Sequence, residues 1–208
     1  MKKIVVVLLC GVFCTLVLAD QSNLLRNPSF EDGILGQADR AIYWTMHEPD
    51  DHGDTYGSAT REDWRSYDGL YIMAIRGLWA NAGDYGGCWQ EADAEPGTKY
   101  RASGWFWADP EWRAELQEMK LEFWSAGYED LLMTKSTGIR RIGPEWRRYE
   151  VEARAPEGAD KVRLVIHAEG IGYNGALQFD HLVLADVEHF VEPEAWPIDL
   201  MIDILDEE

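Results

Sequence analysis

The chain has 208 residues with 38 acidic and 19 basic side chains, so its formal charge is −19. A charge this negative repels polyanions and argues against nucleic acid or an anionic membrane as the partner. Apolar residues make up 46% of the chain, which is too many for a disordered protein and enough for the core of one domain.

Residues 1–19 have the pattern of a cleavable secretory signal. A basic start, K-K, precedes an apolar stretch over residues 4–18, and V-L-A at its end predicts cleavage between Ala19 and Asp20. The mature chain keeps 189 residues and a charge of −21, because both lysines lie in the signal. We therefore expect a secreted or periplasmic protein with no membrane insertion after cleavage; a permanent anchor is the alternative.

The cysteines predict no disulfide in the mature chain. Cys10 and Cys14 lie in the signal and follow Leu9 and Phe13, whereas lipid attachment needs a small residue before the cysteine. Cys88 alone remains after cleavage, so it has no partner within the chain.

Short segments with period-two alternation, separated by Gly- and Pro-containing turns, follow along the mature chain. The clearest of them are residues 98–108, 118–125, 147–155, 161–168 and 176–186. Many short strands at such spacing predict an all-β sandwich or barrel. A segment over residues 110–118 has a helix-like pattern and could form one or two turns.

The composition changes after Asp186. Residues 188–208 carry eight acids together with Pro193 and Pro197, which is typical of a solvated acidic tail or a linker. Residues 199–205 could instead form a short helix.

Alternation also assigns the two faces of the best strands. In residues 100–108, Tyr100 and Phe106 belong to the apolar set that we expect to face the core, which leaves Trp105 and Trp107 on the opposite face with Arg101. The same reasoning places outward side chains on two further strands, namely Glu122 and Trp124 in residues 119–124 and His167 in residues 162–167.

Four motifs occur in one order along the chain. They are N-L-L-R-N-P-S-F-E-D-G at 23–33, A-E-P-G-T-K-Y-R-A-S at 94–103, A-P-E-G-A-D-K-V-R-L at 155–164 and L-Q-F-D-H-L-V-L at 177–184. Together they resemble the carbohydrate-binding modules of families 4, 9, 16 and 22. The resemblance implies a jelly-roll β-sandwich of two antiparallel sheets over residues 20–187, with a glycan as the partner. His181 departs from the pattern, because a second Asp is usual there.

The resemblance and the alternation together predict a sugar-binding sheet face. An indole ring stacks on the apolar face of a pyranose, and amide, carboxylate, guanidinium and imidazole groups bind its hydroxyls. The candidate ligand-binding residues are Tyr85, Gln90, Arg101, Trp105, Trp107, Glu122, Trp124 and His167. Gln90 is included because it falls where the resembling modules often place a sugar-contacting amide. The alternative is that the tryptophans belong to the core or lie under loops.

The other tryptophans have structural roles in this interpretation. We expect Trp44, Trp79 and Trp112 to anchor loops, and Trp89 and Trp146 to pack inward.

The resemblance further implies a structural Ca²⁺ held by Glu31, Asp68 and Asp180, the first and last of which lie in neighbouring strands of the resembling modules. Calcium prefers six to eight oxygen ligands, which carboxylates and carbonyls supply. The alternative is that Glu31 caps a turn and Asp180 accepts a backbone amide.

The function predicted from these observations is a secreted, monomeric, non-catalytic carbohydrate-binding module. The sequence contains no serine-hydrolase, zinc-protease or phosphate-loop motif, and chance carboxylate pairs are expected among 38 acids. A structural or adhesion domain without a sugar site is the first alternative, and a polysaccharide-active enzyme is the second.

Overall fold

The computed structural model describes residues 23–47, 57–76, 85–140 and 143–187. The predicted signal, the acidic tail at 188–208 and Trp79 lie outside the described residues, so their predictions are not tested by it.

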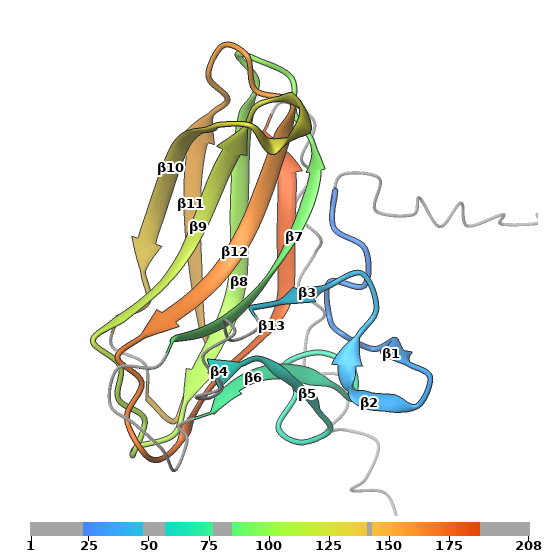
Figure 1. The fold of residues 1–208 in the computed structure, drawn as a ribbon. Helices are drawn as coiled ribbons and strands as arrows, with labels where there is room; N and C mark the ends of the chain where they lie inside the picture. The colour runs from blue at the N-terminus through green and yellow to red at the C-terminus, as the bar shows by residue number, and fades with distance from the viewer. Residues whose placement is uncertain (1–22, 48–56, 77–84, 141–142, 188–208) are drawn as a thin grey trace, which may run out of the picture.

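The described residues form thirteen β-strands and one short 3₁₀ helix (Figure 1). The elements are β1 (Gly33–Ile34), β2 (Gln37–Ala41), β3 (Thr45–Met46), β4 (Gly57–Ser58), β5 (Thr60–Glu62), β6 (Ile72–Arg76), β7 (Tyr85–Asp93), β8 (Lys99–Ala108), β9 (Leu116–Trp124), η1 (Ala126–Tyr128), β10 (Leu131–Gly138), β11 (Arg147–Arg154), β12 (Lys161–Glu169) and β13 (Ala176–Asp186).

Two sheets pack face to face as a β-sandwich, with the small β1–β2 hairpin at one side (Figure 1). One sheet has the order β10-β9-β12-β7-β3, with β4 also paired to β7, and the other has the order β11-β8-β13-β6-β5. Neighbouring strands are antiparallel except for the short β4–β7 pair. The predicted all-β sandwich of two antiparallel sheets is confirmed.

The five predicted strands correspond to β8, β9, β11, β12 and β13. The prediction of helical turns at 110–118 is wrong, because this segment is a turn followed by the start of β9. The amide of Trp112 donates to the carbonyl of Asp109 at 3.0 Å, and the buried indole anchors the turn in the core. Trp112 and Trp44, which are 5% and 6% exposed, therefore act as the predicted loop anchors.

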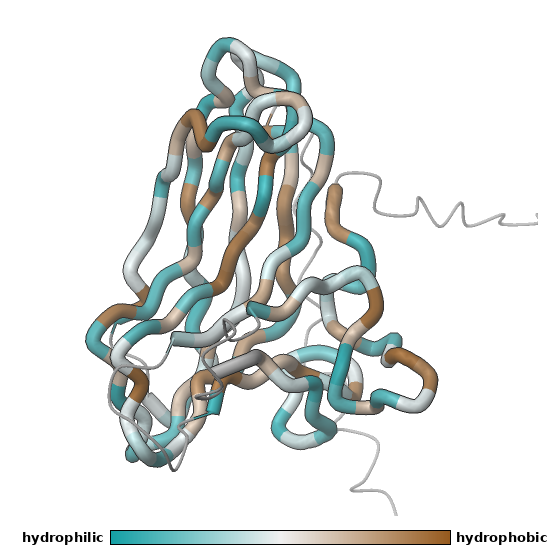
Figure 2. Tube along the Cα trace, in the orientation of Figure 1, coloured by the Kyte–Doolittle hydropathy of each residue, from teal (hydrophilic) through white to brown (hydrophobic). Residues whose placement is uncertain are grey.

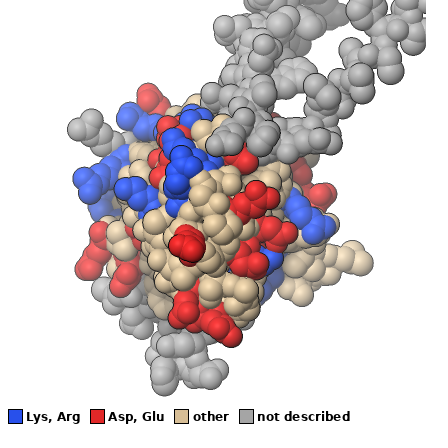
Figure 3. Space-filling model, turned by 90° about the horizontal axis from the view of Figure 1, so that it is seen from above, with Lys and Arg blue, Asp and Glu red and all other residues tan. Residues whose placement is uncertain are grey.

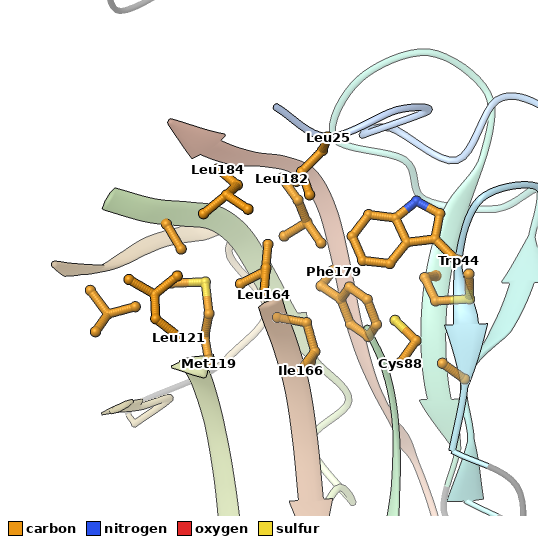
Figure 4. Close-up of a cluster of buried hydrophobic side chains, with 14 of the residues drawn as sticks. Leu25, Trp44, Cys88, Met119, Leu121, Leu164, Ile166, Phe179, Leu182 and Leu184 are labelled. Atoms are coloured by element: carbon orange, nitrogen blue, oxygen red, sulfur yellow. The ribbon is translucent and has the colours of Figure 1, made fainter. Parts of the chain in front are cut away.

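Alternate residues of both sheets point into one apolar core (Figure 4). Phe106, Leu121, Leu164 and Phe179 are fully buried there and come from strands of both sheets. The tube coloured by hydropathy shows the same alternation along the strands (Figure 2). Cys88 is a free thiol buried in this core, and burial raises the pKa of that thiol.

Charged side chains of both signs surround one end of the sandwich (Figure 3). Cross-strand ion pairs of the sandwich include Lys161 with Asp93 and Lys99 with Glu152. Such exposed pairs contribute little to stability. The described part of the chain contains no helix that is long and apolar enough to cross a membrane.

Candidate functional site

The structure divides the predicted ligand-binding residues between the two sheets. The outer side of the sheet that contains β7, β9 and β12 carries Tyr85, Glu122, Trp124 and His167. The outer side of the sheet that contains β8 carries Arg101, Trp105 and Trp107. The prediction of one shared face is therefore wrong. In β8, β9 and β12, alternation assigned inward and outward sides correctly, but it does not show to which sheet a strand belongs.

Gln90 faces inward and its amide is already bonded. It is 6% exposed, its Oε1 accepts the amide N–H of Arg26 at 2.7 Å, and its Nε2 donates to the carbonyl of Arg26 at 2.9 Å. This reciprocal pair attaches the N-terminal segment to β7. Gln90 is thus a structural residue, which corrects the prediction that it contacts sugar.

A loop over residues 63–71 covers the tryptophans of β8. The ring of Tyr67 stacks on Trp105 with centroids 4.1 Å apart and an interplanar angle of 16°. The guanidinium of Arg65 lies 3.9 Å from the centroid of Trp107, which is 3% exposed. Both indoles therefore pack against this loop rather than forming an open platform.

Arg101 is held by a cross-strand ion pair on the same sheet. Its Nε and Nη2 lie 2.7 and 2.6 Å from Oε1 of Glu152, and Lys99 binds the other carboxylate oxygen. Hydrogen bonds from Lys99 and Arg101 lower the pKa of Glu152.

The second candidate is the outer side of the other sheet, which we call the β12 face. Its members share outward positions on β7, β9 and β12 or lie in the loop that follows β9: they are Tyr85, Trp89, Glu91, Lys120, Glu122, Trp124, Tyr128, Arg163 and His167. Arg163 is at the centre of one end, directly opposite Glu91 on β7 and Glu122 on β9.

Arg163 brings three aromatic rings together at that end. Its guanidinium carbon lies 3.7 Å from the ring centroid of Trp89, 5.2 Å from that of Trp124 and 5.5 Å from that of Tyr128. Its Nη2 pairs with Glu91 at 3.1 Å. The cation is thus desolvated by aromatic rings and neutralised by a carboxylate, an arrangement that favours cation–π attraction.

Glu122 links the middle of the face to the same cluster. One of its carboxylate oxygens accepts the indole N–H of Trp124 at 3.2 Å, and the other lies 3.2 Å from the ammonium of Lys120. Trp124 is half-buried, so its edge is fixed while part of the ring stays accessible.

A second group of rings occupies the other end of the face. The rings of His47 and His167 are 5.8 Å apart, and both contact Tyr85, at 6.3 and 6.4 Å. Burial lowers the pKa of His47 to about 4. Burial, and to a smaller extent the positive charge of Lys120, lowers the pKa of His167. Both imidazoles are therefore neutral at pH 7, and each has one hydrogen-bond donor and one acceptor.

The spacing of the two groups suits an extended ligand. Residues 163 and 167 lie on the same strand four positions apart, which corresponds to about 13 Å. Rings for stacking and fixed polar groups for hydroxyls therefore occur at two places along one sheet face.

Several members of the β12 face were missed from the sequence. Trp89 was expected to pack inward, but it is half-buried on the outer side, and Glu91, Tyr128 and Arg163 were not considered as ligand residues. Trp146 also packs outside the main core, against Ile72, Ala74 and Ala176. Alternation in Y-G-G-C-W-Q-E-A-D would have placed Trp89 and Glu91 beside Tyr85, but Tyr128 lies in a loop that has no periodic signal.

Two of the predicted calcium ligands, Glu31 and Asp180, hold the loop at 66–71 through backbone amides, whereas the third, Asp68, lies in that loop with its Oδ2 3.2 Å from Nδ1 of His181. Asp180 accepts the amides of Tyr67 and Asp68 at 2.9 Å each, and Glu31 accepts those of Leu70 and Tyr71 at 2.9 and 3.0 Å. Burial raises the pKa of Asp180 to about 7, against the effect of the amides, which favour the charged carboxylate.

Within the described ranges, no three acidic, histidine or cysteine side chains are gathered as a metal site. The structural calcium thus stays a prediction, and a melting experiment tests it. At free calcium 100-fold above the dissociation constant, bound calcium adds about 2.7 kcal/mol, or roughly 5–10 °C in melting temperature. Equal melting temperatures in excess chelator and in millimolar calcium would exclude the ion. A calcium-dependent shift in melting temperature that persists in the Glu31→Ala, Asp180→Ala double variant would mean that calcium binds at another site.

Comparisons with solved structures show which known proteins share this fold. The sequence matches no protein-family profile and no curated protein. A family 61 module in complex with β-1,4-galactotriose has a TM-score of 0.53 at 18% identity, with 79% of this chain and 98% of that chain covered. A family 16 module has a TM-score of 0.52 at 17% identity, with coverages of 79% and 100%. The chain has the fold of a carbohydrate-binding module.

The same sandwich also occurs within a larger protein. The enzymatically active domain of tailspike protein 4 from bacteriophage CBA120 has a TM-score of 0.59 at 14% identity. That match covers 79% of this chain, which spans only 21% of the tailspike chain. The matches to the family 61 and family 16 modules confirm, at the level of the fold, the resemblance inferred from the four sequence motifs.

Proposed function

We propose that this chain is a secreted, non-catalytic carbohydrate-binding module whose β12 face binds a polysaccharide or oligosaccharide. The observation that supports this most strongly is that two rings on that face are each held beside a fixed polar partner. Trp124 with Glu122 and Tyr128 with Glu91 combine a stacking surface with carboxylate oxygens. A pyranose needs this combination, because it has an apolar face and a rim of hydroxyls.

The carboxylates of the face favour binding over hydrolysis. Glu91 and Glu122 lie on opposite sides of β12, so their backbones are about 10 Å apart. Glu91 is engaged by Arg163 and Tyr128, and Glu122 by Lys120 and Trp124. A glycosidase instead needs one carboxyl that is free to deliver a proton.

The secreted state is proposed from the signal pattern at residues 1–19.

The expected affinity follows from the type of contact. A glycan on this face would make a few ring stacks and exposed hydrogen bonds, and these mostly replace contacts that both partners make with water. We therefore expect dissociation constants between about 1 mM and 1 μM, or roughly −4 to −8 kcal/mol.

Trp124→Ala should weaken glycan binding without unfolding the module. Loss of one stacking ring is expected to reduce affinity by about tenfold, which corresponds to ~1.4 kcal/mol. Titration calorimetry with a polysaccharide that binds the parent measures the change. Trp64→Ala is the matched control, because Trp64 is 42% exposed and lies in the loop that covers the other sheet. Equal affinity of Trp124→Ala and the parent would remove this ring from the site.

A further inference from the structure

We propose that Arg163 and Glu91 are positioning residues that fix the Tyr128 ring beside Trp124, so that these two rings contact the glycan while Trp89 serves as the base of the cluster. This inference rests on the proposed function of the β12 face. It assigns different roles to three neighbouring aromatic residues, Trp89, Trp124 and Tyr128, because their surroundings differ.

Trp89 is covered by a side chain of the protein itself. The guanidinium of Arg163 lies 3.7 Å from its ring centroid, which is stacking distance. The Arg163 side chain is only 16% exposed, so it is packed between the rings rather than extended into solvent. Because Arg163 occupies this surface of Trp89, a sugar cannot stack there at the same time.

Glu91 connects this base to the loop above it. One of its oxygens pairs with Nη2 of Arg163 at 3.1 Å, and the other accepts the hydroxyl of Tyr128. Glu91 and Arg163 are direct neighbours across β7 and β12, so the sheet register fixes their geometry. The Glu91 carboxylate thereby attaches the Tyr128 side chain to the sheet.

Tyr128 needs such an attachment because its own loop provides little. It ends the three-residue η1, where Gly127 and Tyr128 have φ angles of 71° and 60°. Tyr128 is 40% exposed, and its ring contacts Trp124 edge-on with centroids 6.4 Å apart. Without Glu91, the phenol would lose its hydrogen bond to the sheet and the ring would sample other rotamers.

The Tyr128 hydroxyl gives a test that requires no glycan. The hydrogen bond to Glu91, with burial, raises the pKa of Tyr128. The tyrosinate absorbance of the mature chain, minus that of its Tyr128→Phe variant, isolates this group from the other eight tyrosines. The same subtraction in the Glu91→Gln background should show a lower pKa. An unchanged pKa would overturn the link between Glu91 and Tyr128.

A double-mutant cycle then tests positioning. Glu91→Gln should weaken polysaccharide binding about as much as Tyr128→Ala, and the two together should cost little more, because both remove the same ordered ring. Arg163→Lys keeps the positive charge but loses the planar stacking group, so it should also weaken binding by about tenfold. Arg148→Lys, in an Arg–Glu pair with Glu150 on the other sheet, is the control.

Two outcomes of the cycle would contradict the inference. Additive losses from Glu91→Gln and Tyr128→Ala would mean that each acts on the glycan independently. Parent-like affinity of both Glu91→Gln and Arg163→Lys would mean that neither positions the rings. If the parent binds no glycan, the proposed function fails, whereas the tyrosinate titration still decides whether Glu91 positions Tyr128.

Discussion

Trp107→Ala should lower the free energy of unfolding by about 3–5 kcal/mol, the range for truncating a buried aromatic side chain. The indole is 3% exposed and lies under the guanidinium of Arg65. Truncation removes the ring and leaves Arg65 without the surface on which it packs. Chemical denaturation of the mature protein, monitored by circular dichroism, measures the loss.

Trp64→Ala is the control for this substitution. Trp64 lies in the same loop and also contacts Arg65, with 4.5 Å between the guanidinium carbon and the ring centroid, but it is 42% exposed. We expect its loss to cost less than about 1 kcal/mol, as for most exposed sites. Equal stabilities of the Trp107→Ala and Trp64→Ala proteins would show that the loop does not cover β8 as described.

Asp180→Ala should destabilise the protein by about 3–5 kcal/mol, because it leaves three part-buried backbone donors without their acceptor. Asp180 is fully buried and accepts three backbone amides, those of Tyr67 and Asp68 at 2.9 Å and that of His181 at 2.6 Å. The melting temperature should fall by roughly 2–4 °C per kcal/mol for a domain of this size. The measurement is made below pH 7, because burial raises the pKa of this carboxyl to about 7 and its ionisation above that pH costs folding free energy, which the alanine would relieve.

Glu31→Ala provides the comparison for Asp180. Glu31 accepts two amides of the same loop, those of Leu70 and Tyr71, but it is half-buried. Water can therefore replace part of what is lost, and we expect a cost of about 1–2 kcal/mol. An Asp180→Ala protein that melts like the parent would show that the loop does not depend on this carboxylate.

The fold was predictable because it follows from local patterns. Alternation in β8, β9 and β12 identified the inward residues correctly, and turn residues marked the strand ends. The helix predicted at 110–118 does not form, because Trp112 is buried in a turn while Leu116, four positions later, begins β9 and is 40% exposed. Tertiary contacts outweigh weak local propensity in such short segments.

The candidate site was only half predictable, because it depends on which strands share a sheet. Trp105 and Trp124 both alternate outward, yet the sandwich separates them, and alternation carries no information on strand order. Gln90 was misassigned because its bonds run to the backbone of a residue 64 positions away. Tyr128 reaches the site through a loop, and its partner Glu91 became visible only once the register of β7 and β12 was known.

Affinity electrophoresis of the mature protein tests the central claim most directly. The gels contain soluble neutral polysaccharides such as xylan and β-glucan, and the parent is run beside a variant that combines Trp124→Ala and Tyr128→Ala. A reducing-sugar assay on the same polysaccharides reports any hydrolysis. We predict that at least one polysaccharide retards the parent but not the variant, without release of reducing ends. Retardation of neither protein by any glycan, equal retardation of both, or hydrolysis by the parent would contradict a non-catalytic binding site on the β12 face.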